Sequence, residues 1–332
     1  MTLWGGKTDR FSRLLLNSSK ATVNRILLHF FTFSLFAFPL CGDSSVRLQS
    51  DEPNLIGYRF EDDDVGHMDF KLSLKYPLFH RAEAPGTKLS LDWDRLSPRL
   101  YFAFTGRFAQ YIGTRDSSPV ISKRFNPKLI SRLWLDEGKT WFDLAYEHES
   151  NGQSINTAAG FSQQRTYHQS KLEDPNFAKD SISRGWDFIS ATLEHKIYHQ
   201  GWLFKAHWNF RHFLKDGLLQ GAAEELWPFE NVSLALSRRN VDGISFGLST
   251  RYTRNWRWIQ SQWVDLYYTT GTTHPFRRNT LVWTLGLQVG PMPVAIWGHH
   301  GYLSDLAAYH ESSNAYGISF SLQSFLPWSW KK

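Results

Sequence analysis

The chain has 332 residues, of which 20% are charged and 16% aromatic, and its mean hydropathy is −0.40. No apolar run of ~20 residues follows residue 43, which excludes a bundle of membrane helices. A polar average with many aromatics suits a membrane β-barrel instead. The formal net charge is +6, but residues 1–40 hold five basic side chains and one acidic one. The remainder therefore carries about +2, which gives no reason to expect a nucleic-acid partner.

The first 43 residues have the pattern of a signal peptide. Basic side chains from Lys7 to Arg25 precede an apolar stretch, residues 26–40, which is too short to cross a bilayer comfortably. Polar residues follow from Asp43. We therefore predict a leader at residues 1–43 and one domain at residues 44–332, with a short membrane anchor as the alternative reading of the leader. Cys41 is the only cysteine, so a mature chain would have neither a disulfide nor a cysteine metal site.

After residue 60 the dominant pattern is strict alternation of apolar and polar residues. Turn residues such as Gln200-Gly201 and Gly290-Pro291 separate the alternating segments. The apolar members, at every second residue, run from Met68 to Tyr76, Trp202 to Phe210, Ile244 to Leu248, Leu281 to Val289 and Tyr316 to Leu322. The longer segments approach the ~10 residues that a tilted strand needs to cross a bilayer.

The chain holds thirteen candidate strands, of which residues 87–93 alternate least clearly. Because single-chain bacterial barrels close on an even number, we predict an all-β fold, a transmembrane antiparallel β-barrel of about 12 strands. A soluble two-layer sandwich would also alternate, but its solvent face should be rich in Lys and Glu. Here the polar face is mostly Ser, Thr, Gly and Gln, as expected for a packed barrel interior.

One predicted strand ends in residues suited to catalysis. Along residues 142–150 the even positions are apolar until His148 and Ser150, so these two side chains share the lipid-side face. An uncovered polar pair facing lipid is costly unless it has a function there. A serine becomes a nucleophile when an adjacent base takes its proton. The backbone N–H of Gly152, just beyond the strand, is a candidate donor to an oxyanion.

A His-x-Ser pair alone is a weak signal, because the chain contains it three times. The copies at His168 and His310 lack the Asn-Gly that follows Ser150, and we interpret both as loop or surface residues. Without further context, a pair of this kind is more often structural than catalytic.

Four segments together resemble the outer membrane phospholipase A family. Residues 146–152, YEHESNG, resemble its Tyr-x-His-x-Ser-Asn-Gly segment, and residues 181–187, SISRGWD, resemble its Ser-Arg-x-Trp-Asn segment. Ser117-Ser118-Pro119, followed by Phe125, Pro127 and Leu129, resembles a Ser-Ser-Pro loop of the family. Gly301-Tyr302 with Ser304, Leu306 and Tyr309 resembles its Gly-Tyr-x-x-Ser-Leu-x-x-Tyr stretch, with Asp305 inserted. The likeness spans roughly residues 50–326 and is loose between 200 and 295.

This resemblance implies a 12-stranded, homodimeric outer-membrane barrel that hydrolyses acyl esters of membrane phospholipids and needs calcium. It implies Ser150 as nucleophile, His148 as base and the Gly152 N–H in the oxyanion hole. It also implies Ca²⁺ held by the backbone carbonyl of Gln153, the hydroxyl of Ser183 and an oxygen of Ser117 from the other subunit. Oxygen ligands of this kind suit calcium.

The third catalytic position departs from the family, which usually has Asn where this chain has Asp187. Alternation places Asp187 on the same lipid-side face as His148 and Ser150, where it would complete a Ser-His-Asp triad. Because the family uses Asn, we expect Asp187→Asn to keep substantial activity. The insert at residues 154–180 is longer than the corresponding link in the family. The alternative function is a non-catalytic outer-membrane barrel, either a pore or a degenerate relative.

Overall fold

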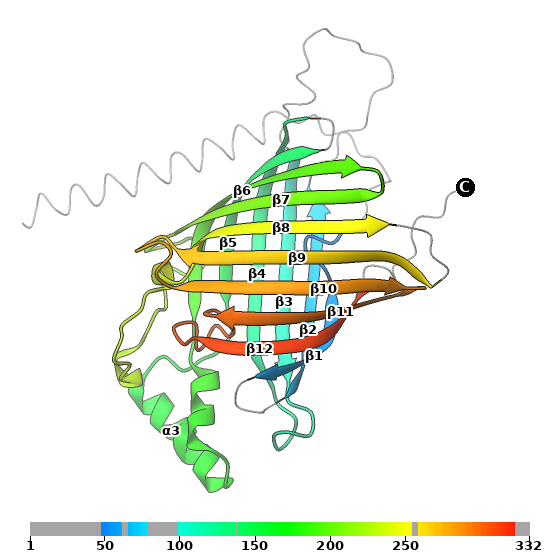
Figure 1. The fold of residues 1–332 in the computed structure, drawn as a ribbon. Coiled ribbons are helices and arrows are strands. Elements are labelled where there is room, and N and C mark those ends of the chain that lie inside the picture. The colour runs from blue at the N-terminus through cyan, green and yellow to red at the C-terminus, as the bar shows by residue number, and fades with distance from the viewer. Residues whose placement is uncertain (1–47, 62–65, 79–98, 137–138, 254–257, 323–332) are drawn as a thin grey trace, which may run out of the picture.

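Twelve antiparallel strands close into a barrel in the computed structural model, which describes residues 48–61, 66–78, 99–136, 139–253 and 258–322 (Figure 1). The strands are β1 (Leu55–Glu61), β2 (His67–Pro77), β3 (Arg99–Gln110), β4 (Val120–Trp134), β5 (Thr140–Ser150), β6 (Gly185–His199), β7 (Trp202–Phe213), β8 (Gly243–Thr253), β9 (Ile259–Gly271), β10 (Asn279–Val289), β11 (Met292–Gly301) and β12 (Ser313–Ser321). Each strand pairs with its neighbours in sequence, and β1 pairs with β12 to close the barrel.

The predicted fold class is confirmed. The alternating segments at residues 68–76, 202–210, 244–248 and 281–289 fall within β2, β7, β8 and β10. The segment from Tyr316 to Leu322 lies on β12 and runs one residue past its end. The candidate strand at residues 87–93 and the predicted leader at residues 1–43 lie outside the described residues. No helix in the described part of the chain is long and apolar enough to cross a membrane.

The outer face of the barrel is an apolar belt formed by the outward members of the strands. On β10, for example, Leu281, Trp283, Leu285 and Leu287 are exposed, whereas Thr280 is buried. The same kind of exposed side chain occurs on β3, β7, β8, β9, β11 and β12, including Phe102, Phe204, Trp208, Phe210, Leu248, Leu266, Ile296 and Ile318. In water such a surface would be unfavourable, but it matches the hydrocarbon of a bilayer.

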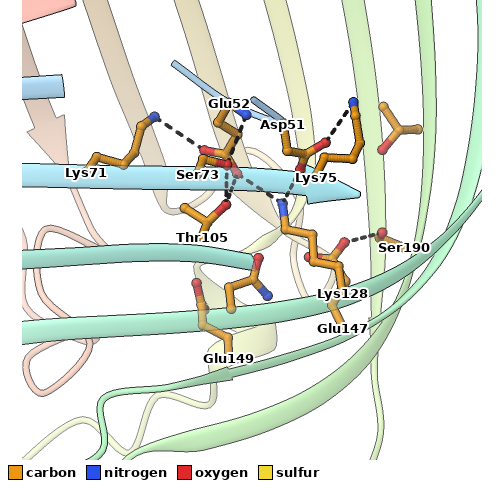
Figure 2. A network of polar contacts seen from close by, with 12 residues as sticks. Asp51, Glu52, Lys71, Ser73, Lys75, Thr105, Lys128, Glu147, Glu149 and Ser190 are labelled. Atoms are coloured by element: carbon orange, nitrogen blue, oxygen red, sulfur yellow. Dashed lines mark hydrogen bonds and ion pairs between the residues drawn. The ribbon is translucent and has the colours of Figure 1, made fainter. Parts of the chain in front are cut away.

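Backbone and charged side chains occupy part of the lumen (Figure 2). Residues 49–54, which precede β1, fold into it, and Gln49 pairs with Lys75 of β2. Figure 2 shows Asp51 and Glu52 lying among lysines of β2 and β4. The Lys128 ammonium lies 3.2 Å from Asp51 and 3.0 Å from Glu52. Sequence alternation predicted a polar interior of small residues, but paired charges contribute much of it.

A second group of buried charges lies near the ends of β5 to β8. The buried Arg238 guanidinium donates to Glu149 at 2.6 Å and to Asp242 at 2.8 Å. Beside it lies an apolar cluster of Trp186, Phe188, Phe213, Val241, Leu306 and Tyr309. A buried charge is tolerated only when it is paired, and here the Arg238 guanidinium faces two carboxylates.

The two ends of the barrel differ in their connections. At one end Gln200-Gly201 and Gly290-Pro291 join strands by tight turns, while the other end carries residues 151–184, 214–242 and 302–312. We call the second end the long-loop end. Two short helical segments, η2 (Pro228–Glu230) and η3 (Arg238–Asn240), belong to it.

The insert between β5 and β6 projects from the long-loop end (Figure 1). It contains α3 (Ala158–Ser170), which Thr157 caps, and η1 (Pro175–Ser181), which Asp174 caps. No residue of α3 is buried. Arg115, in the β3–β4 connection, pairs with Asp180 of η1 at 2.5 Å, so the insert is tied to the rim of the barrel.

Candidate active site

His148 and Asp187 lie directly opposite each other on the outer face of the barrel. They are register partners in the β5–β6 ladder, and directly opposed residues of a ladder point to the same side. The Nδ1 atom of His148 is 2.7 Å from Oδ1 of Asp187. The inward residues of the same two strands include Glu147 and Ser190, which contact each other in the lumen (Figure 2).

The Asp187 carboxylate is fully buried although its strand faces lipid. Residues 214–222, which follow β7, fold over it on the outer face, and we call them the covering loop. The N–H groups of Leu219 and Gln220 donate to Oδ2 at 2.7 Å and 3.1 Å, and the Tyr146 hydroxyl donates to the same oxygen. Leu218 N–H in turn donates to the Tyr146 oxygen at 2.7 Å.

This set of donors fixes the proton on the histidine. A carboxylate is acceptor-only, and Oδ2 already accepts three hydrogen bonds, so Oδ1 is left to accept from His148 Nδ1–H. In the neutral tautomer that these contacts select, Nε2 of His148 is the free acceptor and is the atom that can act as a base. Asp187 thus has the geometry of the third member of a Ser-His-Asp triad.

The same contacts revise the expectation that Asn can replace Asp187. An amide has one oxygen and one NH₂ group. If its oxygen faces His148, its NH₂ group meets the N–H donors of Leu219 and Gln220. If its oxygen faces these donors, its NH₂ group faces Nδ1 and forces the proton onto Nε2. Either arrangement conflicts with the contacts around Asp187.

Ser150 lies at the end of β5 on the same outer face, two residues beyond His148. Its register partners are Gly185 on β6 and Phe125 on β4. In the described part of the chain no hydrogen bond joins the Ser150 hydroxyl to the His148 ring. Catalytic hydrogen bonds are often long without substrate and shorten in the complex, so the absence of this bond does not conflict with the proposed pair.

The turn after Ser150 is built around Asn151 and Gly152. The buried Asn151 amide donates to Ile182 O at 2.7 Å, and its oxygen accepts from Arg184 N at 3.0 Å. Gly152 has φ +60°, and a Cβ there would lie 3.0 Å from the Phe125 ring. Only glycine fits this position without strain. Gly152 is exposed and its N–H donates no hydrogen bond within the described residues, so it remains available to a substrate oxygen.

Two of the three predicted calcium ligands lie on neighbouring segments. Residues 151–155 run beside residues 182–184, with Ser183 N donating to Ile155 O at 2.9 Å, so Gln153 and Ser183 belong to adjacent stretches. The Ser183 hydroxyl contacts the Glu224 carboxylate. Ser117 is exposed in the β3–β4 connection and forms no hydrogen bond to Gln153 or Ser183 within the described chain. A hydroxyl, a carbonyl and a carboxylate are oxygen donors that fit a hard cation.

Several residues of the site escaped the sequence interpretation. Tyr146 was counted as an apolar member of its strand and as part of the segment that resembles the family, but no contact with Asp187 was expected of it. The covering loop had no recognisable sequence pattern. Glu224 could not be linked to Ser183, because 41 residues separate them. Arg184 is fully buried and joins three segments, donating to Glu230 at 2.5 Å and to the carbonyl oxygens of Glu225 and Ala307.

The other two His-x-Ser copies lie apart from this arrangement. His168 and Ser170 belong to α3, where the His168 ring contacts Glu173 at 2.6 Å and the Ser170 hydroxyl donates to Tyr167 O. His310 lies in the β11–β12 connection beside Glu311. Neither histidine faces Asp187 on the outer surface.

Comparison with known proteins adds a fold relationship. No family model matches the chain, and no curated protein does. The structure of outer membrane phospholipase A from Escherichia coli matches with a TM-score of 0.53 and 13% identity, over 82% of this chain and 98% of that one. The calcium-bound dimer of the Salmonella typhi outer membrane phospholipase matches with a TM-score of 0.54 and 13% identity, over 85% of this chain and 94% of that one.

At this identity the likeness shows the fold alone. The chain is a closed 12-strand β-barrel of the outer-membrane type, and it is located in the outer membrane. The structure of the NanC porin also matches, with 9% identity and a TM-score of 0.37, a value too low to bear on function.

Proposed function

We propose that the protein is a calcium-dependent phospholipase A of the outer membrane, which hydrolyses acyl ester bonds of membrane phospholipids. The observation that carries the proposal is the 2.7 Å contact between His148 Nδ1 and the buried Asp187 carboxylate, on the lipid side of the barrel and two residues from Ser150. A carboxylate on the lipid-facing side of a barrel costs free energy to bury, even with a full set of hydrogen-bond donors. Hydrolysis of a membrane lipid gives it a purpose there.

The reaction would follow the steps of a serine esterase. His148 Nε2 takes the proton of the Ser150 hydroxyl as its oxygen attacks the ester carbonyl carbon. The Gly152 N–H donates to the carbonyl oxygen as it gains negative charge. When the ester C–O bond breaks, His148 returns the proton to the lysophospholipid oxygen. A water molecule then attacks the acyl-serine, with His148 again accepting a proton, which releases the fatty acid and restores Ser150.

The oxygen donors near Ser183 fit a calcium ion. The Ser183 hydroxyl and the Gln153 carbonyl would hold it, and Glu224 is a further carboxylate beside Ser183. A bound calcium would supply positive charge close to the developing oxyanion. Ser117 would come from a second copy of the chain, so we include a homodimer in the proposal.

A non-catalytic barrel is the second candidate. The residues before β1 argue against a pore, since they lie in the lumen and their carboxylates pair with Lys75 and Lys128. A degenerate relative that has lost activity would need no intact cage around Asp187, yet the described residues supply four donors to that carboxylate.

The proposal is tested with purified protein, phospholipid in mixed micelles and mass spectrometry of the products. We expect release of fatty acid with calcium, loss of release with chelator, and no release from Ser150→Ala at any calcium concentration. Glu224→Gln should need more calcium for half-maximal rate, whereas Glu173→Gln, which removes a carboxylate of the insert, should not. Equal release by wild type and Ser150→Ala would refute the proposal.

A further inference from the structure

The covering loop ends in an apolar tip on the outer surface of the barrel. Leu218 and Leu219 are 69% and 64% exposed, although the backbone of the same two residues is hydrogen-bonded to Tyr146 and Asp187. The loop is closed on itself, since Gly217 N donates to Gly221 O at 2.6 Å and Ala223 N donates to Lys215 O at 3.1 Å. A short closed loop of this kind holds its tip in one place.

The loop lies against the outward face of β5 and β6 through close contacts. A Cβ on Gly217 would lie 1.9 Å from the Asp187 carboxylate, and a Cβ on Gly185 would lie 2.2 Å from the Gln220 side chain. Gly185 is the register partner of Ser150. The loop therefore reaches from Asp187 to the position opposite the proposed nucleophile, always on the side of the barrel that faces lipid.

We propose that the covering loop is a lipid-contacting positioning element: Leu218 and Leu219 enter the acyl-chain region of the membrane beside Ser150, while the amides of Leu219 and Gln220 hold Asp187 against His148. The lipid contact rests on the fold and the location, and the role in catalysis rests on the proposed phospholipase function. Leu218 and Leu219 would then contact the acyl chain of the substrate and the acyl chains of neighbouring lipids.

Lipid is the occupant that the surroundings favour. The tip continues the apolar belt of the barrel, in which Phe210 at the end of β7 is 48% exposed. Two adjacent leucines left in water keep their apolar surface hydrated, whereas transfer of that surface into hydrocarbon is favourable. Leu172, two residues beyond α3, is 96% exposed but belongs to the projecting insert, so it supplies a matched control for an apolar residue at the surface.

The lipid contact is tested by fluorescence. In a chain with Cys41→Ser, Leu219→Cys and separately Leu172→Cys are labelled with a polarity-sensitive bimane and placed in phosphatidylcholine vesicles. We expect the probe at position 219 to be quenched by acyl-chain spin labels and protected from iodide, and the probe at position 172 to show the reverse. Iodide quenching at 219 would overturn the proposal. Protection of 219 from both quenchers would also overturn it, because a second protein copy would then cover the tip.

The role in catalysis is tested by comparing two substrates. Leu218→Ser with Leu219→Ser keeps the backbone amides, so hydrolysis of bilayer phospholipid should fall about tenfold through a higher KM and should fall more than hydrolysis of a short water-soluble ester. Leu172→Ser, which lies in the projecting insert, should leave the kinetics on both substrates unchanged. Gly217→Ala displaces the amides from Asp187, so kcat should fall on both substrates while the quenching pattern at position 219 is retained. Wild-type kinetics in both variants of the covering loop would overturn the positioning role. An inactive wild type whose probe at 219 is still quenched by lipid would refute the phospholipase function and support the lipid contact.

Discussion

Replacement of Asp187 by Asn tests the covering loop and the triad together. The substitution removes one oxygen and a charge from a site with four donors: His148 Nδ1–H, two backbone N–H groups and the Tyr146 hydroxyl. The orientation that preserves the base must abandon the hydrogen bonds from Leu219 and Gln220, and bonds to a charged group contribute about 1.5–3 kcal/mol each. The amide will therefore favour the orientation that places the proton on Nε2.

Turning the amide so that its oxygen faces His148 Nδ1 costs about 3 kcal/mol. Because each 1.36 kcal/mol is a tenfold change in rate, kcat should fall about 100-fold. The assay is initial-rate hydrolysis of a short soluble ester, which avoids differences in lipid binding. Asp143→Asn is the matched control, because Asp143 is also buried on β5 but pairs with Arg132 in the lumen at 2.7 Å, and its kcat should change less than about threefold. A kcat for Asp187→Asn within about threefold of wild type would refute the reasoning about the donors.

Three further predictions concern the nucleophile, the oxyanion donor and the insert. Ser150→Ala should abolish hydrolysis and leave a heat-stable barrel, whereas Ser312→Ala should keep near-normal activity in the same assay. An inactive Ser312→Ala beside an active Ser150→Ala would mean that the nucleophile belongs to the His-x-Ser copy at His310. Gly152→Ala should lower kcat at least about tenfold, because φ +60° is strained for alanine and its Cβ meets Phe125 at 3.0 Å; steady-state kinetics at saturating calcium would show it, and an unchanged kcat would contradict it. Burial raises the pKa of Asp180 from 3.8 to about 6, so the stability that the protonated carboxyl gives the insert is fully present below pH 3.8 and is lost as the pH rises through 6. Limited proteolysis of the insert should therefore accelerate in wild type relative to Asp180→Asn from about pH 4 to about pH 6.5, and a constant ratio would contradict the shift.

The barrel could be predicted because lipid and lumen impose opposite demands on alternate residues. On β10 the apolar members from Leu281 to Leu287 all face outward, and on β5 the alternation correctly placed Ser150 and His148 on the outer side. The lumen was harder to predict. The pairing of Asp51 with Lys75 and Lys128 joins segments far apart in sequence, and only the closed barrel brings them together.

The site could be predicted where it lies on strands and not where it depends on loops. Alternation and the family resemblance placed Asp187 on the same lipid-side face as His148, and the register adds that the two residues are direct partners. The covering loop has no period, so nothing in the sequence placed Leu219 over Asp187. The flanking glycines at 217 and 221 were the one available signal, since two glycines around a Leu-Leu pair mark a tight turn with an apolar tip.

Covalent labelling of the nucleophile tests the central claim most directly. An alkyl fluorophosphonate reacts with a serine only when a neighbouring base activates it. Wild type should be labelled at a single serine, which peptide mapping by mass spectrometry should assign to Ser150. Labelling should be lost in His148→Ala and strongly slowed in Asp187→Asn. Labelling at Ser312 or Ser170, or none at Ser150 in calcium-loaded protein in lipid, would contradict the account.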